Sequence, residues 1–267
     1  MTPRSRQLKL LLGRWWTGPH PVAADVWWVG GNPGRLRAYL IRDADGGVTL
    51  FDAGGAMMLQ GLRRALGLVG PLERVVLSHA HTDHRGAANE LGAPVYCHED
   101  EVEDVEGSGG FRYWGEGLPK LPLARRLLHV HVLQPLYDAG GVRVAGVLRE
   151  RDDVSGFRVV HLPGHAPGLI ALHRERDGVA LTSDAFYTVD DWWRDCPPYP
   201  PGPAWSLDAE AARRSLARLA ELDLRAAWPG HGSPLTADVS EQLRRAATSL
   251  PAPQAPARSR RSRRRRA

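Results

Sequence analysis

The chain contains the stretch His79-Ala80-His81-Thr82-Asp83-His84, in which three imidazoles and one carboxylate lie within six residues. Divalent zinc and iron ions favour these donors. Residues 74–77, Arg-Val-Val-Leu, predict a short buried-type strand that leads directly into the stretch. In an extended segment His79 and His81 point the same way, and a helix that starts near Thr82 would turn the next two donors toward the same point. We therefore predict a metal site at the end of a strand.

Three further donors of the same kind follow expected strands at places rich in turn residues. His165 lies in Pro163-Gly164-His165-Ala166-Pro167-Gly168, Asp184 comes after the apolar run 179–181, and His231 lies in Pro229-Gly230-His231-Gly232. Glycines beside a ligand let the backbone approach a metal closely, and a strand end holds a ligand on a rigid support. The predicted ligand set therefore has seven members: His79, His81, Asp83, His84, His165, Asp184 and His231.

The rest of the sequence alternates between strand and helix patterns. Strands are expected at residues 24–29, 36–41, 48–52, 74–77, 94–96, 157–162, 169–173, 179–182 and 226–228, and helices at residues 57–69, 87–91, 208–222 and 239–247. Residues 103–148 are rich in Gly, Pro and aromatic residues, so we expect an irregular excursion that acts as a lid. Within it, the alternation His129-Val130-His131 predicts a half-exposed strand rather than a second ligand pair. We expect one domain over residues 1–250.

Composition narrows the class of protein. Hydrophobic residues make up 43% and charged residues 24% of the 267 residues, as in ordinary globular proteins. No run approaches the roughly 18 apolar residues of a membrane-spanning helix. The two cysteines, Cys97 and Cys196, form no CxxC pair, so a reducing cytoplasm is the expected location.

The net charge of +5 has a local origin. Seven arginines fall in residues 251–267, which leaves residues 1–257 with a net charge of −2. This arginine-rich segment has nothing apolar to bury, and we predict that it is a disordered tail. Weak contact with nucleic acid or an acidic surface through the tail is a secondary expectation, beside a small-molecule substrate as the main partner. The oligomeric state is left open.

The order of the motifs resembles the metallo-β-lactamase superfamily, whose HxHxDH signature is followed by a single His, Asp and His. Asp52-Ala53-Gly54-Gly55 also matches the early Asp-x-Gly motif of that family, in which the Asp supports the metal loop. The resemblance runs from about Asp25 to Gln242. It implies an α+β fold, the αββα sandwich, in which two mixed β-sheets face each other, helices flank them, and metals lie at one edge.

The resemblance also implies a role for each donor. His79, His81 and His165 would hold one metal ion, Asp83, His84 and His231 a second, and Asp184 would bridge the two. The pattern is closest to the glyoxalase II, lactonase and RNase Z branches and favours two divalent ions, zinc first, with iron or manganese as alternatives. A bridging hydroxide would then cleave a small ester, thioester or lactone. Asp83 would protonate the leaving group, and Tyr187 would contact the substrate carbonyl, as a tyrosine does in acyl-homoserine lactonases.

Three other functions stay open at this point. A phosphodiesterase or nuclease fits the arginine-rich tail, although no Lys or Arg cluster flanks the metal motifs. A persulfide dioxygenase with a single iron would share the first motif. A scaffold with a vestigial site is the non-enzymatic alternative. Glyoxalase II itself is disfavoured, because only one helix and the tail follow His231.

Overall fold

The computed structural model describes residues 16–31, 35–110, 117–190 and 193–249 and contains two large mixed β-sheets and a small hairpin. The first sheet is ordered β1 (Trp16–Ala23), β2 (Val26–Gly31), β3 (Leu36–Arg42), β4 (Val48–Phe51), β5 (Leu72–Val76), β6 (Val95–His98) and β7 (Val144–Leu148). The second is ordered β14 (Ala226–Pro229), β11 (Val179–Ser183), β10 (Ile170–Arg174), β9 (Phe157–His161) and β8 (Asp153–Val154). The hairpin pairs β12 (Tyr187–Val189) with β13 (Asp195–Tyr199).

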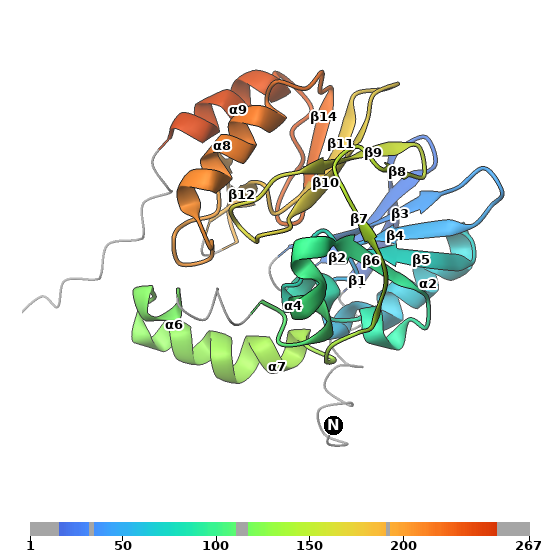
Figure 1. The fold of residues 1–267 in the computed structure, drawn as a ribbon, viewed down its shortest axis with the longest axis horizontal. Helices are drawn as coiled ribbons and strands as arrows, with labels where there is room; N and C mark the ends of the chain where they lie inside the picture. Colours follow the sequence, from blue (N-terminus) through green and yellow to red (C-terminus); the bar gives the residue numbers. More distant parts are fainter. Residues whose placement is uncertain (1–15, 32–34, 111–116, 191–192, 250–267) are drawn as a thin grey trace, which may run out of the picture.

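Helices connect these strands and cover their outer faces. They are η2 (Ala56–Met58), α2 (Leu59–Val69), α3 (Thr82–Arg85), η3 (Ala88–Glu90), η4 (Glu99–Glu101), α4 (Val102–Glu106), η5 (Leu118–Lys120), α6 (Leu123–Leu128), η6 (His129–Leu133), α7 (Gln134–Tyr137), α8 (Ala209–Leu219) and α9 (Val239–Thr248). In Figure 1, α2 lies along the first sheet, and α8 and α9 lie outside the second. No helix within the described ranges has the length and apolarity to cross a membrane.

Three apolar clusters show the four-layer arrangement. Strand β3 is buried on both faces: Leu40 packs with α2 in one cluster, whereas Ile41 packs with the second sheet in another. Successive side chains of a strand point to opposite faces, so one strand serves both layers. A third cluster lies between the second sheet and the helices α8 and α9. The predicted αββα sandwich is therefore confirmed.

The excursion at residues 103–148 is more regular than its composition indicated. It contains α4, η5, α6, η6 and α7, and it ends in β7, which pairs in parallel with β6 as the edge strand of the first sheet. The expectation of a strand at His129-Val130-His131 is wrong, because these residues continue α6 as the π-helical turn η6. Tertiary contacts decide here, since a short apolar alternation is compatible with either structure.

Arg85 joins this helical region to the histidine-rich stretch. The residue is 1% exposed. Nη1 donates to the backbone carbonyls of Asp104, Val105 and Gly107, and Nη2 donates to Asp138 Oδ1 at 3.1 Å. One buried side chain thus satisfies acceptors on both α4 and the loop that follows α7. The arginine-rich tail at residues 251–267 lies outside the described residues.

We predict that Arg85→Met lowers the free energy of unfolding by about 2–3 kcal/mol, because buried acceptors lose their donor. Urea unfolding followed by circular dichroism measures this. Arg63→Met is the control: Arg63 is exposed, and its replacement should change the free energy by less than about 0.5 kcal/mol. Equal unfolding midpoints for the two variants would contradict the assigned role.

Candidate metal centre

Strand ends from both sheets meet at the centre. His79 to His84 follow β5 of the first sheet, whereas Asp184 follows β11 and His231 follows β14 of the second. Strands β11 and β14 are parallel neighbours, so their carboxyl ends share one edge, where Gly230 N donates to the Ser183 carbonyl at 2.8 Å. A backbone bridge between Leu36 and His231 ties this edge to the first sheet.

The structure brings all seven predicted donors together. They form overlapping groups in which one ligand atom from each residue lies within 4.8 Å of the others: His79, His81 and His165; His79, His84 and Asp184; and Asp83, His84 and His231. We call the first group the first triad and the last group the second triad. Whether they bind metal stays a prediction, but their spacing suits shared coordination.

Asp184 lies between the two triads. Its Oδ1 is 3.2 Å from His84 Nε2, and its Oδ2 is 3.4 Å from His165 Nε2 and 3.6 Å from His231 Nε2. One carboxylate therefore faces donors of both triads, which is the arrangement that a bridging ligand requires.

The centre is buried except on one side. His79 and His84 are fully buried, and His165 and Asp184 are 2% exposed. The side chains of His231 and Asp83, whose Nε2 and Oδ2 atoms are 3.4 Å apart, are 14% and 24% exposed. Access from solvent is therefore on the side of the second triad.

The carboxylate of Asp52 orients His84 and, through Ser78, His79 by contacts on the Nδ1 side of the rings. Oδ1 accepts from Ser78 N at 2.8 Å, and Oδ2 accepts from Ser78 Oγ at 2.9 Å, from Ser183 Oγ at 2.8 Å and from His84 Nδ1 at 2.9 Å. Ser78 Oγ also lies 2.9 Å from His79 Nδ1. Such partners on the far ring nitrogen fix the orientation of ligating histidines.

The opposite ring nitrogens fit a metal ion. The Nε2 atom of His79 is buried and makes no hydrogen bond to any described residue, and His84 Nε2 faces Asp184 Oδ1 at 3.2 Å, whereas the Nδ1 atoms of both rings contact Ser78 and Asp52. Buried polar atoms are otherwise nearly always paired. Imidazole and carboxylate donors suit a divalent cation, and together with the fold these clusters support divalent metal ions as the cofactor.

Burial sets the charge of the first triad. Loss of solvation lowers the pKa of His79 and His81 well below the usual histidine value, and it lowers the pKa of His165 to about 4. All three imidazoles are consequently neutral at pH 7. The neutral ring is the form that binds metal.

Two carboxyl groups, Asp83 and Asp184, and two imidazoles, His84 and His231, favour each other's charged forms. Burial disfavours ionisation of Asp184 and Asp83, but the neighbouring His84 and His231 outweigh it and lower the pKa of both carboxyls. Burial likewise opposes protonation of His84 and His231, yet Asp184 raises the pKa of both. A metal ion would replace these protons as the positive charge between the carboxylates.

Tyr187 reaches the same point from β12. Its hydroxyl donates to Asp184 Oδ2 at 2.8 Å, and its ring centroid lies 5.2 Å from that of His231. Burial and the Asp184 carboxylate raise the pKa of Tyr187 well above 10. The phenol therefore stays a hydrogen-bond donor beside the candidate bridging residue.

The helices of the excursion rest against the histidine-rich loop. Thr82 Oγ1 donates to Gln134 Oε1 at 3.1 Å, and Tyr137 contacts Gly55, where a Cβ would meet the ring at 2.7 Å. His129 of η6 contacts the Trp205 ring, with centroids 5.0 Å apart. This segment thus forms a wall close to the metal loop.

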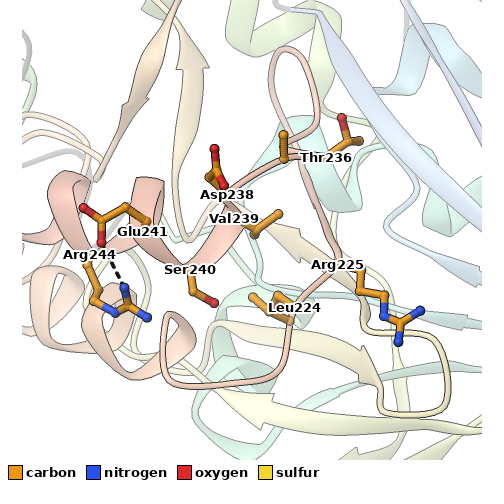
Figure 2. A pocket seen from close by; sticks show the side chains of 9 residues that line it. Leu224, Arg225, Thr236, Asp238, Val239, Ser240, Glu241 and Arg244 are labelled. Carbon is orange, nitrogen blue, oxygen red and sulfur yellow. Dashed lines mark hydrogen bonds and ion pairs between the residues drawn. The ribbon is translucent and has the colours of Figure 1, made fainter.

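A separate hollow of about 500 Å³ lies at the start of α9 (Figure 2). It is lined by Leu224, Arg225, residues 236–241 and Arg244. Arg244 there pairs with Glu241 at 3.0 Å. The lining contains neither a histidine nor any predicted donor, so the hollow is distinct from the metal centre.

Sequence reasoning did not single out Ser78 and Ser183. Each directly precedes a predicted donor, His79 or Asp184, and that adjacency was the available signal. Both hydroxyls donate to Asp52 Oδ2, and the two Oγ atoms lie 2.7 Å apart.

Comparisons with known proteins agree with this geometry. A family model described as the metallo-beta-lactamase superfamily matches residues 31–231. The Bacillus subtilis (strain 168) protein named "Probable metallo-hydrolase YflN" is 27% identical over 207 residues, covering 70% of this chain and 76% of the relative. A second protein of that strain, "Probable metallo-hydrolase YqjP", is 28% identical over 227 residues, and the alignment covers 76% of this chain and 69% of the relative.

Solved structures show the same fold. The metallo-beta-lactamase family protein TTHA1429 from Thermus thermophilus superposes with a TM-score of 0.60 at 26% identity, covering 85% of this chain and 78% of that one. TTHA1623 in a di-iron-bound form superposes with a TM-score of 0.54 at 27% identity, covering 79% and 94%. The relatives support a hydrolase-type enzyme. With the family model spanning the motifs and both sheets, the chain belongs to the metallo-beta-lactamase superfamily.

Proposed function

We propose that this protein hydrolyses a small ester, thioester or lactone at a dinuclear metal centre. The observation that carries the proposal is the position of Asp184, whose two oxygens face His84 on one side and His165 and His231 on the other. This carboxylate and the six donors around it suit two cations better than one.

The first triad would hold one ion, the second triad the other, and Asp184 both. When bound, two divalent cations supply a water that is nucleophilic at neutral pH and a Lewis acid for the substrate oxygen. Nitrogen and oxygen donors suit zinc first, and iron or manganese also. The di-iron form of TTHA1623 makes iron the leading alternative.

The chain's own groups account for the remaining steps. Tyr187 stays protonated, so its hydroxyl can turn from Asp184 and donate to the carbonyl oxygen as negative charge develops there. Asp83 is ionised and lies on the exposed side, where it can accept a proton from the attacking water and pass it to the leaving group. The wall formed by η6 and α7 would act as the lid that shapes the acyl pocket.

We expect the purified, zinc-loaded chain to hydrolyse members of a panel of lactones, thioesters and carboxylic esters. Chelation should abolish the activity, and added zinc should restore it. The same panel includes phosphodiesters, and oxygen uptake is recorded with the iron-loaded chain. Turnover of phosphodiesters alone, or oxygen consumption with one iron per chain, would replace the proposal with one of its alternatives.

We predict that Tyr187→Phe lowers kcat about 100-fold with little change in KM, because a donor to the developing oxyanion is lost. Steady-state kinetics on the best ester of the panel measures both constants. Tyr199→Phe is the matched control, since Tyr199 faces Tyr187 across the hairpin but donates to the Val189 carbonyl. A wild-type kcat in Tyr187→Phe at full metal occupancy would remove this residue from the mechanism.

A further inference from the structure

A fully buried carboxylate outside the donor set links the two segments that carry the first triad. Glu101 lies where η4 ends and α4 begins, and it is 0% exposed. Its Oε2 accepts from Ala80 N at 2.8 Å, and its Oε1 accepts from Gly168 N at 2.7 Å. Each oxygen thus has a backbone donor from a different segment.

These two backbone positions are next to the donors of one triad. Ala80 separates His79 from His81, and Gly168 lies three residues after His165. The segments come from different sheets, since the first follows β5 and the second connects β9 with β10. One carboxylate consequently spans the gap across which the three imidazoles of the first triad must meet.

The fit around the carboxylate is close. A Cβ at Gly168 would lie 2.8 Å from Glu101 Cγ and 3.0 Å from His98 Cβ, so only glycine lets the backbone approach this closely. His98 fixes the start of the turn by accepting from Asp100 N at 3.2 Å. His98 thus fixes the turn that carries Glu101, while Ala80 N and Gly168 N fix its carboxylate.

The chemistry of these contacts requires a carboxylate. Hydrogen bonds from backbone N–H groups to an ionised oxygen are about twice as strong as neutral ones. Glutamine has almost the same shape, but its amide offers one acceptor and one NH₂ donor. In Glu101→Gln one of the two backbone N–H groups would therefore face another donor.

We propose that Glu101 is a positioning residue that sets the metal affinity of the first triad without touching metal or substrate. This inference rests on the metal centre of the proposed function. The second triad is oriented by other groups: His84 by Asp52, and His231 through the bridge between its own backbone and Leu36. The effect of Glu101 is therefore selective for one of the two ions.

The test is a zinc titration of the full chain in competition with a chromophoric chelator. Glu101→Gln should weaken binding at the first triad by about 10- to 100-fold, the range for partners that orient ligands, and leave binding at the second triad unchanged. Repeating the titration in a His231→Ala background assigns the affected equivalent, because this change removes a donor of the second triad alone.

Asp104→Asn is the matched control. Asp104 is 1% exposed and lies three residues after Glu101, inside α4, so its replacement removes a nearby buried carboxylate and should keep both zinc affinities. Glu101→Asp keeps the charge but is shorter by one methylene, so it should lower the zinc affinity of the first triad less than Glu101→Gln does. If Glu101→Gln does not fold, a selective loss of zinc affinity at the first triad in Glu101→Asp is the deciding result.

Wild-type zinc affinity in the Glu101 variants, or equal weakening of both triads, would overturn the inference. A wild-type chain that binds no zinc would instead overturn the metal centre itself. The two failures are thus distinguishable.

Discussion

The contact between Asp52 and two serine hydroxyls is the constraint on which the remainder of the centre depends. Ser78 follows β5 of the first sheet, Ser183 ends β11 of the second, and both donate to Asp52 Oδ2. Asp52 and Ser183 have φ values of 60° and 45°, a left-handed backbone conformation that residues other than glycine seldom adopt. Strain of this kind persists where surrounding contacts hold it, and it gathers at functional sites.

This junction explains why the donors converge although they come from separate strands. Asp52 holds His84 directly and His79 through Ser78, so the same carboxylate orients imidazoles of both triads. Among the described residues, His79 Nε2 is buried without a hydrogen bond, and it belongs to the same donor group as the ionised carboxylate of Asp184. Such a set is costly to bury unless a cation completes it. The same contacts thus join the two sheets and orient the donors of the predicted metal centre.

Much of this could be predicted from the sequence, because the informative residues are chemically unusual. Histidines and an aspartate at the spacing of residues 79–84 have few alternative explanations, and the order of the motifs, which resembles the metallo-β-lactamase superfamily, implied the sandwich. Helix boundaries near 57–69 and 239–247 agree with α2 and α9 within a few residues. The contacts of Glu101 could not be predicted, because an acid at the start of a polar helix is common and only the fold brings it to Ala80 and Gly168. The helix at His129 was mistaken for a strand for the same reason: tertiary packing decided it.

The most direct test of a dinuclear centre bridged by Asp184 is the metal content of the purified full chain, measured by mass spectrometry in wild type and in Asp184→Ala. The account predicts two divalent ions per wild-type chain and no more than one in the variant, since the carboxylate that both ions share is gone. A single ion per wild-type chain under metal excess, or two ions retained without Asp184, would contradict it.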